Sequence, residues 1–189
     1  MPNSLSGSAP GKPDLADIRF IEVTPETRGD FETLFEQPGA PKYCWCTAWR
    51  HSSREHVDKK RMMMTFIDNG TPVGIIAELD GRIVGWCSVA PRETYRKLSK
   101  QQDDSETGVW SIVCFYVPRS LRGTGLASAL LDAAIEHAFV KGALVIEAYP
   151  VDEAAPSYRF MGFRGMFTAR GFREESMAGS RRHVMRLDR

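Results

Sequence analysis

The residues best suited to chemistry lie between Trp110 and Leu131, where an apolar run leads through an Arg- and Gly-rich turn into a helical pattern. The turn reads Arg122-Gly-Thr-Gly125. The first amides of a helix have no intrahelical acceptor, and the helix dipole is positive at that end. Glycine lets a bulky anion approach the backbone closely, and arginine adds a charged, forked donor. This order of elements predicts a cradle for a phosphate or diphosphate group.

Other uses of such a turn have different sequence requirements. A P-loop needs a Lys followed by Ser or Thr after its glycines, and no such pair follows Gly125. A dinucleotide-binding fingerprint needs a third glycine at the position where this chain has Ser128. A purely structural turn is the simplest alternative, and the strand–turn–helix setting favours the phosphate cradle over it.

Hydrophobic periodicity places this segment within a mixed α/β fold. The nearly continuous apolar run 109–117 predicts a buried central strand, and the stripe from Leu126 to Val140 predicts an amphipathic helix. Asp80-Gly81 between two apolar runs predicts a tight hairpin, and the polar stretch 91–107 predicts a surface loop. Further strands are expected at 18–23, 73–79, 82–89, 143–149 and 183–187, and further helices at 24–36, at 52–68 (capped by Ser52 or Ser53, with Glu55 in its first turn) and within 156–170.

Composition narrows the class of protein. The chain has 189 residues, and 25 Lys and Arg against 24 Asp and Glu leave a formal net charge of +1. This balance gives no global electrostatic attraction to nucleic acid or an anionic membrane. The start of the chain lacks a secretory pattern, and no stretch approaches the about 18 apolar residues of a membrane span, so a cytoplasmic location is expected. Residues 1–17, rich in Pro, Gly and Ser, predict a flexible tail before a single domain at 18–189.

The cysteines indicate free thiols rather than a disulfide framework, because they are few and two of them fall inside apolar strand-like runs. Cys44 and Cys46, with His51 and His56, are the best zinc candidates in the chain. Structural zinc sites usually offer a second ligand pair at defined spacing, and Cys-x-Cys is not the usual Cys-x-x-Cys. No metal is therefore expected.

The turn and the residues after it resemble the GNAT superfamily of acetyltransferases. The signature of that family is Arg or Gln, two residues, Gly, one residue, then Gly or Ala, and it is matched by Arg122, Gly125 and Ala127. The segment 166–172, Met-Phe-Thr-Ala-Arg-Gly-Phe, is similar to the late helix that runs into Gly-Phe and a final hairpin. Cys44-Trp-Cys46 and the run 86–92 look like a little-characterised branch of the family.

The resemblance covers roughly residues 18–188, with its specific motifs in 110–172. It implies an α/β fold with a mixed, centrally splayed sheet of six or seven strands and helices on both faces. It also implies acetyl transfer from acetyl-CoA to a primary amine of a small molecule, or less favourably of a protein, by direct attack in a ternary complex. A non-catalytic acyl-CoA-binding or regulatory module is the second hypothesis, and the sequence leaves open whether two copies pair as a homodimer.

The same resemblance suggests which residues contact the coenzyme. The pantetheine arm is expected to pair with the backbone of the strand before the turn, and the diphosphate is expected at the turn and the helix start. The expected contacts are Phe115, Tyr116, Val117, Arg122, Gly123, Thr124, Gly125, Leu126 and Ala127.

An attacking amine must lose a proton, and Glu147 is the first candidate for the general base. It lies within the apolar run Leu-Val-Ile-Glu-Ala-Tyr, where desolvation would raise its pKa, although a structural Glu paired with an Arg is an equally simple interpretation. Ser111 is a second candidate, which could only position water.

Phe167 stands where many relatives carry a tyrosine acid, so Tyr158 or Tyr149 is the candidate substitute, unless solvent supplies the proton. Trp45, Trp86 and Tyr149 are the candidate contacts to the acceptor.

Overall fold

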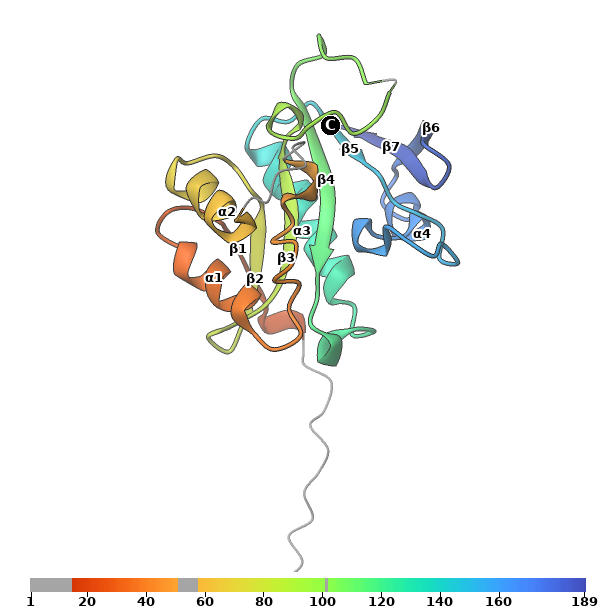
Figure 1. The fold of residues 1–189 in the computed structure, drawn as a ribbon. Coiled ribbons are helices and arrows are strands. Elements are labelled where there is room, and N and C mark those ends of the chain that lie inside the picture. Colours follow the sequence, from red (N-terminus) through yellow and green to blue (C-terminus); the bar gives the residue numbers. More distant parts are fainter. Residues whose placement is uncertain (1–14, 51–57, 101) are drawn as a thin grey trace, which may run out of the picture.

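The computed structural model describes residues 15–50, 58–100 and 102–189 (Figure 1). Within these residues the strands and α-helices follow one another as β1 (Arg19–Glu22), α1 (Arg28–Glu36), α2 (Lys59–Asp68), β2 (Ile75–Leu79), β3 (Arg82–Pro91), β4 (Val109–Tyr116), α3 (Leu126–Val140), β5 (Val145–Ala148), α4 (Arg164–Thr168), β6 (Arg173–Ala178) and β7 (Arg182–Asp188). No helix among them is long and apolar enough to cross a membrane.

The strands form a single seven-stranded sheet in the order β1-β2-β3-β4-β5-β7-β6. Only β4 and β5 are parallel, and each of the other neighbouring pairs is antiparallel. A parallel pair needs a crossover connection, which α3 provides between β4 and β5. The expected early hairpin and later strand–helix–strand unit are therefore both confirmed.

The sheet splays between β4 and β5. β4 pairs with β5 only from Val109 to Ile112, where β5 ends at Ala148. β4 continues to Tyr116, and on its other side it stays paired with β3 to that residue. The last four residues of β4 therefore have no partner strand on the β5 side, which leaves their backbone groups on that side available.

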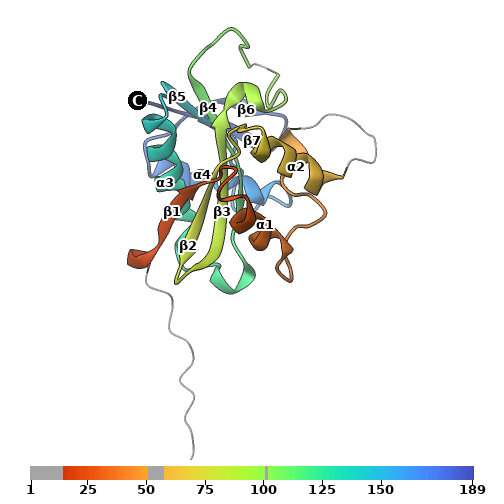
Figure 2. The same ribbon diagram turned by 90° about the vertical axis from the view of Figure 1, so that its left-hand side faces the viewer.

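Helices cover both faces of the sheet, as expected (Figure 2). α1 and α2 pack into one apolar cluster, and α3 packs into a second cluster on the opposite face. Each helix buries one stripe, which is what helical periodicity predicts. The buried residues are Phe31, Leu34 and Phe35 of α1, Met63, Met64 and Ile67 of α2, and Leu126, Leu130, Leu131, Ala134 and Ala138 of α3.

The helix starts differ from the expected ones. α1 begins at Arg28 rather than at Thr24, because the Thr27 side chain accepts the Thr24 N–H at 2.8 Å and the intervening residues form a turn. α2 begins at Lys59, where Asp58 accepts the N–H of Arg61 at 3.0 Å as a helix cap. The caps expected at residues 52 and 53, and the acid at 55, lie outside the described residues.

Asp80 and Gly81 form the expected hairpin turn, with φ of 51° and 72°.

Two other segments differ from what the sequence predicted. The loop after β3 was expected at the surface because it is polar, but three of its side chains are buried: Arg92, Tyr95 and Leu98. Apolar periodicity gave no signal for β6, whose first residues are charged and exposed, as is typical of an edge strand.

Candidate active site

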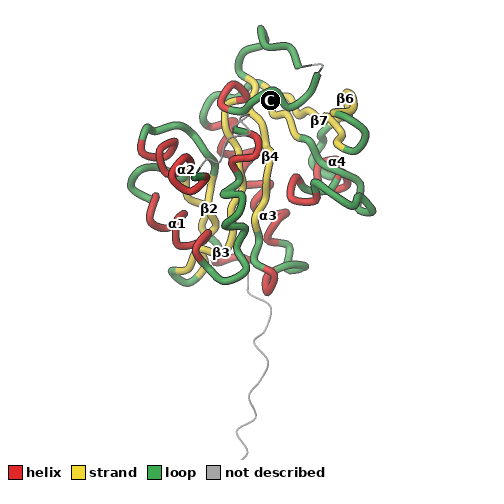
Figure 3. The backbone as a smooth tube through the Cα atoms, viewed as in Figure 1, coloured by secondary structure: helices red, strands yellow, loops and turns green. Residues whose placement is uncertain are grey.

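The loop after α1 passes alongside β4 (Figure 3). Residues of both segments line a cavity of about 790 Å³. Its wall joins three parts of the chain: the loop between α1 and α2, the end of β4 with the start of α3, and the turn before α4. The lining residues are Gly39, Pro41, Tyr43, Cys44, Cys46, Ala48, Trp49, Cys114, Phe115, Tyr116, Val117, Leu121, Arg122, Gly123, Gly125, Leu126, Ala127, Ser128, Arg159, Phe160 and Phe163.

The start of α3 forms one end of this cavity. Gly125 is the helix cap, with a φ of 96°, and Gly123 also has a positive φ, of 75°. A Cβ at Gly123 would have no atom within 4 Å, so space lies beside the turn. The first turn of α3 contains no acidic residue, and the exposed Arg122 guanidinium is attached to the turn through a 3.3 Å bond to the Val117 carbonyl. This is a positive, open helix start of the kind that binds phosphate.

The expected coenzyme contacts lie in the cavity wall, with one exception. The backbone of Phe115 to Val117 lines the middle of the cavity, at the end of β4 beyond the last residue paired with β5. The residues from Arg122 to Ala127 line its end, except Thr124. The Thr124 hydroxyl instead donates a hydrogen bond to the Leu121 carbonyl at 2.7 Å, within the turn itself.

Glu147 lies in a different environment from the apolar one expected for a general base. It is 3% exposed, outside the cavity wall, and its Oε2 accepts a 2.9 Å hydrogen bond from Arg186. Oε1 accepts the hydroxyl of Tyr149, and Arg92 lies 3.7 Å from Oε2. Glu106 pairs with the same two arginines. A base needs a lone pair that faces the acceptor, whereas this carboxylate is held by guanidinium groups, an arrangement that favours the interpretation of a structural Glu paired with an arginine.

Ser111 and Tyr149 lie beside Glu147 rather than in the cavity wall. Ser111 is opposite Glu147 in the parallel register of β4 and β5, and it is fully buried. Tyr149 is also fully buried, and burial raises the pKa of its hydroxyl well above the ordinary value. The structure thus brings these three predicted residues together, and none of them lines the cavity.

Trp45 and Trp86, the expected contacts to the acceptor, lie in the core. The Trp45 ring stacks on Phe35 at 5.1 Å, and the Trp86 ring meets Phe35 edge-on at 5.4 Å. Both indoles are at most 3% exposed and neither lines the cavity. Trp49, on the same loop as Trp45, lines it instead. Sequence spacing could not separate these tryptophans, because the loop has no regular periodicity.

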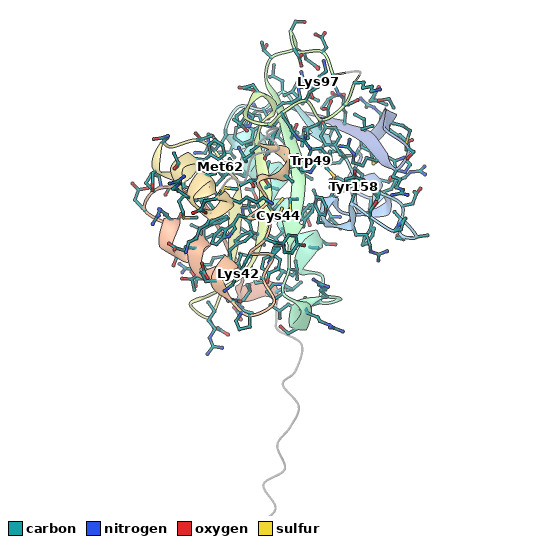
Figure 4. All side chains as sticks on the ribbon, in the orientation of Figure 1. Lys42, Cys44, Trp49, Met62, Lys97 and Tyr158 are labelled. Carbon is teal, nitrogen blue, oxygen red and sulfur yellow. The ribbon has the colours of Figure 1, made fainter. Side chains whose placement is uncertain are left out.

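Tyr158 packs beside Trp49 (Figure 4), although Tyr158 itself is not among the residues that line the cavity. Its backbone is left-handed, with a φ of 61°, and its side chain packs 6.3 Å from the Trp49 ring while the residue stays 38% exposed. Phe167, at the position of the family's usual tyrosine, is fully buried against Phe172 and Phe115. No hydroxyl is therefore available at that position.

Three thiols gather in the cavity wall, a grouping that the sequence did not reveal because Cys114 lies 68 residues after Cys46. The Sγ atoms of Cys46 and Cys114 are 2.8 Å apart. Cys44 supplies the third thiol, and all three cysteines are free. His51 and His56 of the zinc hypothesis lie outside the described residues. Within the described part of the chain, no three His, Cys, Asp or Glu side chains are placed to hold a metal ion.

Comparison with known families supplies the identification. The model of the acetyltransferase (GNAT) family matches residues 32–163, which include β4, the cradle and α3. This chain belongs to the GNAT acetyltransferase family. A comparison of the sequence with curated proteins found no match.

Solved structures share this GNAT fold at low sequence identity. The PaiA N-acetyltransferase of Thermoplasma acidophilum, solved with coenzyme A, is 15% identical with a TM-score of 0.55, over 91% of this chain and 99% of its own. The aminoglycoside acetyltransferase AAC(6′)-Ib, also solved with coenzyme A, is 14% identical with a TM-score of 0.59, over 91% and 95%. The Drosophila melanogaster polyamine N-acetyltransferase is 13% identical with a TM-score of 0.54, over 92% and 100%. These likenesses establish the architecture, including its mixed seven-stranded sheet.

Proposed function

We propose that this chain transfers an acetyl group from acetyl-CoA to a primary amine of a small molecule, in a ternary complex. The observation that carries the proposal is that one cavity contains the cradle at the start of α3, the unpaired end of β4 and the aromatic acceptor end at Trp49. Family membership and the coenzyme A complexes of the similar structures support the choice of coenzyme.

The coenzyme fits the chain's own residues. Arg122 and the open amides of Leu126 and Ala127 are donors for the diphosphate, and the first turn offers no acidic side chain to repel it. The backbone of Phe115 to Val117 can hydrogen-bond the amides of the pantetheine arm as a further strand would, because β5 does not reach that far.

When bound, acetyl-CoA supplies an activated thioester, and transfer forms a C–N bond to the amine as the C–S bond breaks. A backbone N–H near the end of β4 would orient the thioester carbonyl and stabilise negative charge on its oxygen. The described cavity wall contains no Asp or Glu, so the amine gives up its proton to water in the open cavity. Tyr158 is our candidate donor of a proton to the departing sulfur, because it is the phenol beside Trp49 at the acceptor end.

Thiol release across a panel of amines, with calorimetry for coenzyme A, tests this function. We expect saturable coenzyme binding and turnover with at least one class of amine. Tight coenzyme binding without turnover of any amine would favour the non-catalytic module, for which the buried Phe167 at the usual tyrosine position is the specific argument. Absence of coenzyme binding would refute both functions.

A further inference from the structure

Trp49, in the cavity wall, lies against two arginines that come from distant parts of the chain. The Arg182 guanidinium carbon lies 4.5 Å from the Trp49 ring centroid, and that of Arg96 lies 4.9 Å from it. Arg96 also donates its backbone N–H to the Trp49 carbonyl at 2.8 Å, which ties the two segments together. Tyr158 completes the group, 5.5 Å from Arg182. In Figure 4, Trp49 and Tyr158 lie side by side, and Cys44 lies below and to the left of them.

The donors of this group have no acceptor within the described residues. The Trp49 indole Nε1 and the Arg182 Nη1 are buried and make no hydrogen bond. The Trp49 residue as a whole is 8% exposed. Neither Arg96 nor Arg182 forms an ion pair in the part of the chain that the structure describes. A buried donor without an acceptor is costly, so such a group calls for an oxygen from water or from a ligand.

Two other arginines, one buried and one partly exposed, have carboxylate partners, unlike the exposed Arg96 and the partly buried Arg182. Arg92 and Arg186 are matched by Glu106 and Glu147 in a cluster of two positive and two negative side chains. The pair at Trp49 has no such carboxylates. Burial lowers the pKa of Arg182, and the positive charge of Arg96 lowers it further, so the two cations stand close enough to repel one another. An anion bound near both guanidinium groups would relieve that repulsion.

Arg96 and Arg182 are not themselves lining residues of the cavity, but the described cavity wall carries the same sign of charge. It contains Arg122 and Arg159 and neither Asp nor Glu. A polycationic amine would find no counter-charge along this wall. An amine that also bears an anionic group would find two guanidinium groups packed against Trp49, which lines the cavity.

We propose that Arg96, Arg182 and the Trp49 indole form a subsite for the carboxylate of the acceptor, which makes the acceptor an amino-acid-like molecule with one primary amine. This inference rests on the proposed acetyl transfer and names its substrate class. Transfer then yields an N-acetyl amino acid and free coenzyme A, with the amine proton released to water and a proton taken up by the sulfur. Bidentate arginine contacts to a carboxylate, joined by the indole donor, would set the orientation of the amine.

Matched pairs of acceptors test the subsite. Amino acids with different side chains are each compared with the amine that lacks only the carboxylate, by thiol release at saturating acetyl-CoA. We expect the best amino acid to have a kcat/KM about 10- to 100-fold above that of its decarboxylated partner, the range that charged hydrogen bonds supply. Equal or better turnover of the decarboxylated amines, or a preference for polyamines, would overturn the subsite and leave acetyl transfer intact.

Substitutions localise the effect. Arg182→Gln and Arg96→Gln should raise the KM of the amino acid about tenfold or more, with little change for the decarboxylated amine, and Arg182→Lys should restore part of the loss. Arg61→Gln is the matched control, because Arg61 is exposed on α2 and outside the cavity wall, and its loss removes the same charge. An equal effect of Arg182→Gln on both acceptors would count against a carboxylate contact.

A binding measurement separates this inference from the proposed function. The N-acetyl amino acid and the corresponding N-acetyl amine are titrated by calorimetry into the protein with coenzyme A, where no turnover is needed. Tighter binding of the N-acetyl amino acid, lost in Arg182→Gln but kept in Arg61→Gln, supports the subsite even if no amine is acetylated. Equal binding of both compounds rejects the subsite, whatever the assay of transfer shows.

Discussion

The Sγ atoms of Cys46 and Cys114 lie 2.8 Å apart and join the loop after α1 to β4 in the cavity wall. Burial raises the pKa of the Cys46 thiol well above the ordinary value. The hydrogen bond with Cys46, followed by burial, likewise raises the pKa of Cys44. Both thiols are therefore protonated at neutral pH, and the contact holds the loop between α1 and α2 against the sheet rather than presenting a nucleophile.

Alkylation should report this protonation state. At pH 7.5 we expect Cys44 and Cys46 of the native protein to react with iodoacetamide much more slowly than after unfolding in guanidinium, because only the thiolate reacts. Peptide mass spectrometry over a time course measures each site, and the unfolded chain provides the reference rate. Native labelling of Cys46 at the unfolded rate would show that its thiol is neither buried nor protonated.

Replacing Arg122 should weaken coenzyme binding. Arg122→Gln removes the charged donor of the cradle, and we expect the Kd for coenzyme A to rise about 10- to 100-fold. Because the Arg122 side chain is exposed, thermal stability should hardly change. Calorimetry gives the Kd, with Arg61→Gln as the control that loses the same charge elsewhere. An unchanged Kd in Arg122→Gln would contradict the cradle.

Glu147→Gln should affect stability more than catalysis. The substitution leaves the buried Arg92 without one of its carboxylate partners, and breaking a buried pair costs about 3 kcal/mol. Urea unfolding measures the loss, and kcat on the folded protein should stay within about twofold of the original, since a general base would contribute at least about 100-fold. A collapse of kcat without loss of stability would restore Glu147 as the base.

Acid should destabilise the fold through Glu106. Hydrogen bonds from Arg186 hold the pKa of Glu106 below its ordinary 4.5. Because the folded pKa is the lower one, this pairing stabilises the protein fully above pH 4.5 and the contribution disappears as the pH falls through the folded pKa. The urea midpoint should therefore drop between about pH 5 and 3, and Glu106→Gln should show a smaller drop. Identical pH profiles of the two proteins would disprove this linkage.

Tyr158→Phe tests the candidate proton donor. We expect kcat to fall about tenfold, a modest effect because a thiol leaving group has a pKa of about 8.5 and needs little assistance. Tyr43→Phe is the matched control, since Tyr43 lines the cavity and is 81% exposed. If both variants keep the original kcat, solvent supplies the proton.

The sequence by itself determined the local features of this GNAT protein. The hairpin at Asp80-Gly81, the helix from Leu126 to Val140 and the glycine-rich cradle depend on residues that are neighbours in the chain. Turn chemistry and hydrophobic period act over a few residues, so they can be recognised without the rest of the fold.

Only the tertiary structure decided which side chains meet. Glu147 pairs with Arg186, 39 residues away in the sequence, and Arg186 pairs with Glu106, 80 residues away. The apolar residues around Glu147 in its strand therefore did not reveal these charged partners. Trp45 enters the core while Trp49 reaches the cavity, although both lie in one loop. Burial and charge pairing are set by how strands and loops pack across the whole domain, and these long-range contacts leave no periodic trace in the sequence.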